Sequence, residues 1–149
     1  MQFYKLHYSP FIVMISELEL VARIFLAFVL GGVIGFERER VDKPAGLRTH
    51  ILVSVGSAQF TILSFYAFPG SDPSRIAAYV VAGIGFIGAG TIMQTRDRII
   101  GVTTAASIWV AASAGMAAGI GFYLAAVVVT VISYLTLKLG RWKEGRLED

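Results

Sequence analysis

The chain has 149 residues, of which 56% are hydrophobic and 15% are charged, and its mean hydropathy is +0.70. Because soluble domains carry about 25% charged residues, this composition argues against a soluble enzyme and indicates a membrane protein. The formal net charge of +3 favours contact with anionic lipid over nucleic acid, and the absence of cysteine excludes a disulfide framework and a thiolate metal site.

The apolar part of the chain begins after a short leading segment. Residues 1–16 are interpreted as an N-terminal extension that lacks the cleavage site of a signal peptide, and Met1 and Met14 are both candidate starts of translation. A transmembrane domain is predicted over residues 17–140. Residues 141–149 are expected to form a short charged tail in the cytoplasm.

Five apolar blocks follow, and each is long enough for an α-helix to cross roughly 30 Å of hydrocarbon. They cover residues 20–36, 51–68, 76–93, 102–118 and 122–137. The last two belong to one apolar stretch that would be roughly 58 Å long as a single helix, so we expect it to fold back at Gly119, Ile120 and Gly121. Before the third block, Asp72 is predicted as a helix N-cap and Pro73 as the first helical residue.

The basic residues indicate the orientation of this predicted all-α bundle of about five transmembrane helices. With five crossings, ten of the thirteen Lys and Arg residues fall on one side: Arg38, Arg40, Lys43, Arg48, Arg96, Arg98, Lys138, Arg141, Lys143 and Arg146. Cytoplasmic loops carry an excess of Lys and Arg. The N-terminus is therefore expected outside the cell and the C-terminus in the cytoplasm.

Small residues recur at helical spacing and predict close contact between helices. The set comprises Gly31 and Gly35 in the first block, Gly83, Gly85, Gly88 and Gly90 in the third, and Ser107, Ala111, Gly115 and Gly119 in the fourth. Three of the glycines match G-x-G-x-x-G, but this dinucleotide fingerprint requires a strand-to-helix turn, and here it lies within an apolar block. We favour a tight bundle, with self-association on one of these faces.

Polar side chains follow one face of the second block, at His50, Ser54, Ser57, Thr61 and Ser64. Hydrogen bonds between helices explain such a face, and a polar path through the bundle is the alternative. We favour the hydrogen bonds, because no ionisable group lies in the middle of a span. A lone histidine without a pair of carboxylates predicts no metal site, and no nucleophile with a neighbouring base predicts an enzyme.

Several strings of the sequence resemble the signature of the MgtC/SapB family over roughly residues 17–140. They are Gly35-Phe36-Glu37-Arg38-Glu39, Ala45-Gly46-Leu47-Arg48-Thr49-His50, Asp72-Pro73-Ser74-Arg75-Ile76-Ala77-Ala78, the glycine-rich run from Gly83 to Gly90, and Thr103-Thr104-Ala105-Ala106 followed by Trp109. The resemblance implies a bacterial inner-membrane protein of about five spans, linked to growth under magnesium limitation and, in pathogens, to virulence. It also implies a regulatory role and not magnesium transport. Longer members carry a soluble C-terminal domain, which weakens the virulence link for this chain.

The sequence indicates two alternative functions. The first is regulation of another membrane protein, or self-association, through helix faces within the bilayer, without a cofactor. The second is a transporter or channel for an ion or small solute. Candidate functional residues are the polar groups near span ends within the family-like strings: Glu37, Arg38, Arg48, Asp72, Arg75 and Thr104. Ionisable groups near the membrane are functional candidates by default.

Overall fold

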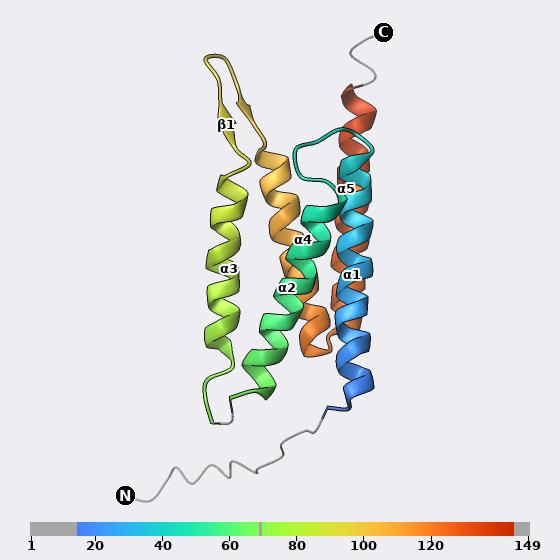
Figure 1. The fold of residues 1–149 in the computed structure, drawn as a ribbon. Helices are drawn as coiled ribbons and strands as arrows, with labels where there is room; N and C mark the ends of the chain where they lie inside the picture. The colour runs from blue at the N-terminus through green and yellow to red at the C-terminus, as the bar shows by residue number, and fades with distance from the viewer. Residues whose placement is uncertain (1–14, 69, 145–149) are drawn as a thin grey trace, which may run out of the picture.

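The computed structural model describes residues 15–68 and 70–144, which fold mainly as α-helices (Figure 1). The elements in chain order are α1 (Glu17–Glu39), α2 (Leu47–Tyr66), α3 (Ser74–Ala89), β1 (Met93–Gln94), β2 (Ile99–Ile100), α4 (Val102–Ile120) and α5 (Tyr123–Glu144). The helices run side by side along one axis, so the start of α1 and the end of α5 lie at opposite ends of the bundle.

The reversal between α4 and α5 lies where the sequence predicted it. Gly121 ends α4 with φ +92°, a left-handed conformation that glycine adopts without a steric penalty. Its N–H donates to the carbonyl of Ala118, and the N–H of Phe122 donates to that of Ala117. These bonds close the end of α4 and release the chain into α5.

The predicted third span is too long at its C-terminal end. Helix α3 stops at Ala89, and residues 93–100 form an antiparallel hairpin in which Met93 pairs with Ile100. Gly90 ends the helix, and the β-branched residues that follow favour extended backbone. The hairpin projects beyond the bundle and leads to Gly101 (φ +94°), from which α4 begins.

Helices α1, α2 and α4 form the centre of the bundle. Their contacts are made of small residues, with Ala27, Ala58, Ala111, Ala114 and Ala118 all fully or almost fully buried. Helix α5 packs against α1 and α4, whereas α3 lies mainly against α4 and less closely against α2. The small residues allow the central backbones to approach, so these three helices are the closest-packed part of the molecule.

The outer surface of the bundle is apolar. Phe86 is 85% exposed and Leu124 78% exposed, and many other large apolar side chains point outward. By length and composition, α1 and α4 could each cross a membrane, while α3 and the apolar part of α5 (Tyr123–Leu139) are shorter. Helix α2, which carries the polar face, is at least as long as α4 but not apolar enough to meet the same criterion.

Candidate functional site

A buried polar cluster lies at the hairpin end of the bundle, where α1 ends and α4 begins. Glu37 and Arg38 in the last turn of α1 are almost fully buried, as is Thr104 in the first turn of α4. The Arg38 guanidinium donates from Nη2 to the Thr104 hydroxyl over 2.5 Å. This hydrogen bond joins two helix ends that are 66 residues apart in the chain.

His50 on α2 completes the cluster. Its Nδ1 lies 2.8 Å from the carbonyl oxygen of Gly46, and its Nε2 lies 3.0 Å from the Ser107 hydroxyl on α4. Because a carbonyl oxygen only accepts, Nδ1 carries a proton in this arrangement. The Ser107 hydroxyl is also 2.8 Å from the carbonyl of Thr104, as its donor. The fully buried imidazole therefore has a polar partner at each nitrogen.

Glycines place His50 and Ser54 against the neighbouring helices. A Cβ on Gly31 would lie 2.6 Å from the His50 carbonyl oxygen, and one on Gly35 would lie 2.7 Å from the Cα of Leu47. On α4, a Cβ on Gly115 would collide with the Ser54 carbonyl. These three glycines are therefore required by packing within the chain, between α1, α2 and α4.

The remaining predicted packing glycines divide into two groups. Gly119 packs on the Ala58 backbone, and Gly88 faces Ala105 at an ordinary contact distance of 3.5 Å. Among the described residues, nothing lies within 4 Å of a Cβ added to Gly83 or Gly85, so the predicted close packing at these two glycines is wrong for this part of the chain. A Cβ on Gly90 would meet only carbonyls of its own helix. The self-association face therefore cannot include Gly31, Gly35, Gly115 or Gly119, which are already covered.

Only some of the side chains on the polar face of α2 form hydrogen bonds outside their own helix. Ser54 donates to the carbonyl of Ala27 on α1 over 2.8 Å, and Ser64 donates to the carbonyl of Pro73, just before α3, over 2.5 Å. Thr61 instead donates to Ser57 of its own helix. On α5, Thr130, Ser133 and Thr136 likewise bond to carbonyls of α5 itself.

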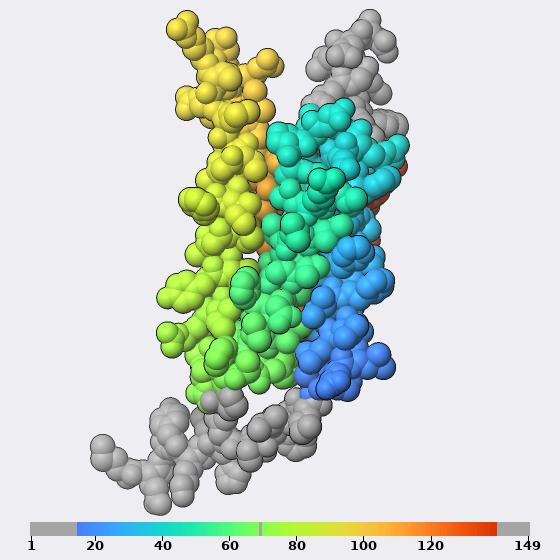
Figure 2. Space-filling view, in the orientation of Figure 1, coloured from blue at the N-terminus to red at the C-terminus, as the bar shows by residue number. Residues whose placement is uncertain are grey.

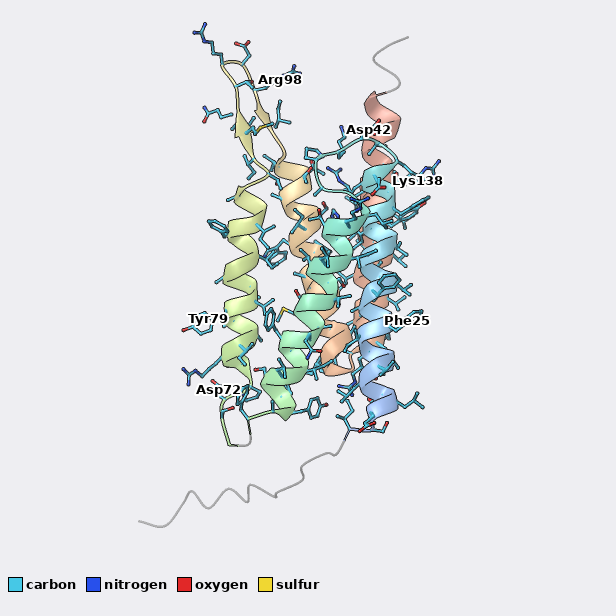
Figure 3. The ribbon with its side chains drawn as sticks, in the orientation of Figure 1. Phe25, Asp42, Asp72, Tyr79, Arg98 and Lys138 are labelled. Carbon is cyan, nitrogen blue, oxygen red and sulfur yellow. The ribbon has the colours of Figure 1, made fainter. Side chains whose placement is uncertain are left out.

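The six predicted site residues lie at two ends of the bundle. Arg48 is exposed in the first turn of α2, at the hairpin end, and Arg75 lies in the first turn of α3, at the opposite end (Figure 1). Asp72 lies at that opposite end as well (Figure 3). Asp72 accepts hydrogen bonds from the Ser74 backbone N–H (2.9 Å) and hydroxyl (2.7 Å). The hydrogen bonds from Ser74, above all that of its hydroxyl, hold the pKa of the Asp72 carboxyl below its ordinary value. Helix α3 begins at Ser74 with Pro73 in the N-cap position, so both were predicted one residue too early, and the Asp72 carboxylate supports this helix start through its bonds to Ser74.

Arg23 was not among the functional residues predicted from the sequence. Its guanidinium is buried at the end of the bundle opposite His50 and donates to Tyr66, Tyr123, the Gly119 carbonyl and Glu19. One signal was present, because Arg23 is the only charged residue inside the first apolar block. Its partners could not be predicted, since the most distant one is 100 residues away in the chain.

An apolar groove lies between α2 and α3. It has a volume of about 540 Å³ and is lined by residues of both helices, among them Gly56, Phe60, Val80, Gly83 and Ile87. The recess between the two helices is visible in the space-filling view, with α4 behind it (Figure 2). Because Gly56 and Gly83 have no side chain and no close neighbour, the groove is open where they face it.

The described residues form no cluster of metal ligands. Within residues 15–68 and 70–144, no three His, Asp or Glu side chains come together in a way that could hold a metal ion. In the polar cluster at the hairpin end, hydrogen bonds join the Arg38 guanidinium to the Thr104 hydroxyl and the His50 imidazole to the Ser107 hydroxyl. That no metal or cofactor binds elsewhere stays a prediction.

Comparison with known proteins identifies the family. The sequence model of the MgtC family matches residues 24–146. The chain belongs to the MgtC family. The match contains Arg38, His50, Thr104 and the whole α2–α3 groove, and the resemblance noted in the sequence is thereby confirmed.

Curated relatives in the MgtC family include proteins of several bacteria. YhiD of Escherichia coli K12, named as a proposed magnesium transporter, is 47% identical over 129 residues, covering 81% of this chain and 60% of its own. Protein MgtC of Brucella abortus is 47% identical over 105 residues, covering 70% and 44%. Protein SapB of Bacillus subtilis is 39% identical over 133 residues, covering 83% and 57%. No solved structure matches.

The chain thus spans about half the length of the curated MgtC-family relatives that it matches. MgtC-family proteins are membrane proteins, which agrees with the apolar helices α1 and α4. The names of these relatives refer to whole proteins, and this chain matches only part of each of them.

Proposed function

We propose that this protein is a multi-pass protein of the bacterial inner membrane that regulates another membrane protein. The chain would cross the bilayer five times, with its N-terminus outside and its C-terminus in the cytoplasm. Support comes from the distribution of charge. Arg98 and Lys138 lie at the hairpin end (Figure 3), and so do the end of α1, the loop after it and the start of α2, which carry Arg38, Lys43 and Arg48 (Figure 1). This basic end matches the cytoplasmic side by the positive-inside rule.

The orientation has a direct test. Reporter domains fused after the last residue and before the first should be active in opposite compartments, the former in the cytoplasm. Reporters at both termini in one compartment would contradict an odd number of crossings. Purified protein that stays soluble without detergent would contradict the membrane assignment itself.

The observation that carries the regulatory proposal is the open groove between α2 and α3. Its lining is almost entirely apolar, and Gly56 and Gly83 expose backbone where a partner would lie. Without a hydrophobic driving force inside lipid, helices associate where small residues permit close backbone approach. We therefore assign the groove to a single transmembrane helix of the regulated protein.

The closed centre of the bundle supports the same proposal. At Gly31, Gly115 and Gly119, the backbones of α1, α2 and α4 approach so closely that even one added methyl group would have to displace neighbouring atoms. The buried hydroxyls of Ser54 and Thr61 are bonded to carbonyls inside the bundle. A solute would have to separate these three helices to pass between them.

The physiological setting is proposed from the family. The MgtC/SapB resemblance implies adaptation to magnesium limitation, and we extend that setting to this chain, together with a weaker link to virulence. Deletion of the chromosomal copy should therefore slow growth when magnesium is limiting. Equal growth of the deletion strain and its parent across magnesium concentrations would contradict the link.

Cross-linking can test the groove because the natural chain has no cysteine. A single cysteine at Val80, which lines the groove, should form a cross-link to a second membrane protein in native membranes. Phe25→Cys is the control, because Phe25 is an exposed residue of α1 that points away from the bundle (Figure 3). If the cysteine at Val80 reacts only with lipid-reactive probes, lipid and not a partner helix fills the groove. The same conclusion holds if the cysteines at positions 80 and 25 cross-link to proteins equally.

A filling substitution gives the matching functional test. Gly83→Leu places a side chain in the open groove, at a position where an added Cβ has no described atom within 4 Å, and should abolish the growth advantage in low magnesium. Ala82→Leu is the control, because Ala82 is exposed on the same helix but is not part of the groove lining. Full activity of Gly83→Leu would contradict the proposed contact.

The second candidate function is transport of an ion or small solute. The name of the E. coli relative favours it, as does the buried cluster of Glu37, Arg38 and His50 at one end of the bundle. Purified protein in liposomes would then move magnesium, protons or phosphate at a rate above that of protein-free liposomes. Absence of flux for each of these ions would exclude this candidate for those solutes.

A further inference from the structure

A second cavity lies at the hairpin end, beside the polar cluster. It has a volume of about 270 Å³ and is bounded by the end of α1, the loop after it, the hairpin, the start of α4 and Leu137 of α5. Its size is below that of a site for a drug-sized ligand, which starts at about 300 Å³. A small ion or one chemical group of a larger molecule therefore fits its dimensions.

Both charged side chains that the described residues place in the wall of this cavity are cations. Among the described residues that line it, Arg38 and Lys43 are cations, and the others are apolar or uncharged. Arg38 is almost fully buried, which holds its guanidinium at a fixed place, and it is further fixed by the 2.5 Å bond to Thr104. A guanidinium is planar and presents several N–H donors to an oxyanion.

The start of α4 supplies hydrogen-bond donors to the wall of this cavity. Thr103 and Thr104 line the cavity in the first turn of α4, and no side chain in the described part of the chain caps this helix end. Gly101, also in the wall, has φ +94° and turns the chain so that α4 begins at the cavity. The first N–H groups of a helix have no partner within the helix, and their dipoles favour negative charge.

We propose that this cavity binds a phosphate group, held by Arg38 and Lys43 as cations and by the first turn of α4 as a donor of N–H groups. The proposal stands on the cavity and its lining and does not depend on the regulatory function. The phosphate has two sources at this place: the headgroup of an anionic phospholipid, or free phosphate. The apolar wall formed by Ile99, Ile100 and Leu137 is compatible with either source.

The experiment uses the full chain in nanodiscs. In phosphatidylcholine nanodiscs, inorganic phosphate is titrated and the melting temperature is followed. In nanodiscs that also contain phosphatidylglycerol, native mass spectrometry counts the lipid that stays bound. The test variant is Lys43→Gln, because Lys43 is exposed at its surface and its loss should not disturb folding. Arg96→Gln, an exposed cation of the hairpin outside the cavity lining, is the charge-matched control.

The expected result is weaker binding in one variant only. Lys43→Gln should raise the dissociation constant about tenfold, which corresponds to the loss of about 1.4 kcal/mol, whereas Arg96→Gln should bind like the natural protein. A melting shift with inorganic phosphate in phosphatidylcholine identifies free phosphate as the source. Retained phosphatidylglycerol without such a shift identifies the lipid headgroup.

Two outcomes would overturn the proposal. One is that neither inorganic phosphate nor phosphatidylglycerol binds to the natural protein above the level of phosphatidylcholine alone. The other is that Lys43→Gln and Arg96→Gln weaken binding equally, which would indicate general attraction to a basic surface. Neither outcome bears on cross-linking from Val80, so failure of this proposal and failure of the regulatory function can be told apart.

Discussion

Arg23, near the start of α1, donates a hydrogen bond from Nη1 to the carbonyl oxygen of Gly119, near the end of α4, over 2.9 Å. The same guanidinium reaches the hydroxyls of Tyr66 on α2 and Tyr123 on α5. One side chain thus joins four of the helices at the end of the bundle remote from His50.

Replacement of this arginine should destabilise the protein. Arg23→Met keeps much of the side-chain volume but leaves the buried Gly119 carbonyl without its donor, which costs about 1 to 3 kcal/mol. Unfolding in detergent, followed by circular dichroism, measures the change. The exposed Arg48 provides a control, because Arg48→Gln should change stability by no more than about 0.5 kcal/mol. Equal stability of Arg23→Met and the natural protein would show that water replaces these bonds at little cost.

Two glycines at different places in the bundle should respond oppositely to the same substitution. Gly115→Ala forces a methyl group against the Ser54 carbonyl, and overpacking of this kind costs about 1 to 3 kcal/mol. Gly83→Ala adds a methyl group in open space and should raise stability by about 0.5 to 1 kcal/mol, through its effect on helix propensity. The two unfolding free energies in the same detergent test this pair. Similar losses at both positions would mean that α3 is packed as closely as α4.

Thr104 should contribute to stability through its hydroxyl. Thr104→Val keeps the shape of the side chain but removes the acceptor of the Arg38 bond, so we expect a loss of about 1 to 3 kcal/mol. Thr103→Val, at the neighbouring exposed position, should be close to neutral when phosphate is absent. Thermal unfolding in phosphate-free buffer distinguishes the two. A neutral Thr104→Val would indicate that Arg38 finds another acceptor.

Asp72 gives a prediction about pH. The Ser74 hydrogen bonds lower the pKa of the folded carboxyl, so its stabilising effect is complete above the ordinary pKa of 3.8 and is lost as pH falls through the lower folded value. Hydrogen exchange at the start of α3, compared between pH 6 and pH 3, should therefore show loss of protection in the natural protein. Asp72→Asn should keep an oxygen that accepts from Ser74 and show a smaller change, because an amide does not titrate there and asparagine supports a helix start about as well as aspartate.

The same variant separates structure from function. If Asp72→Asn folds and supports full growth in low magnesium, then Asp72 serves only to begin α3. If it folds and growth fails, the charge itself is required. Retained pH sensitivity in Asp72→Asn would assign the titration to another group.

The positions of the helices could be predicted from apolar blocks and helix-ending glycines, and the turn at Gly121 is the clearest case. The end of α3 could not, because Ile92 and Met93 are as apolar as the helix before them and periodicity does not distinguish a short strand from a last helical turn. The packing role of each glycine could not be predicted from the sequence either. Spacing alone did not separate Gly115, which packs on α2, from Gly83, which faces open space.

The candidate site was predicted in its parts and not in its assembly. Glu37, Arg38 and Thr104 were selected because they are polar groups near span ends. The structure buries all three and joins Arg38 to Thr104. His50 and Ser107 were recognised only as members of polar or small-residue faces. Their 3.0 Å contact depends on the rotation of α2 against α4, which no local pattern specifies.

The contacts of α2 also determine where the length of the chain is free to change. His50, Ser54 and Ala58 each meet a glycine of a neighbouring helix, so all three must keep their angular positions. One residue inserted between His50 and Ser54 would turn everything after it by about 100° around the helix axis and remove Ser54 and Ala58 from their glycines together. The hairpin between Thr91 and Gly101 has no such constraint at its tip. Insertions and deletions should therefore accumulate there, while α2 keeps a constant residue count.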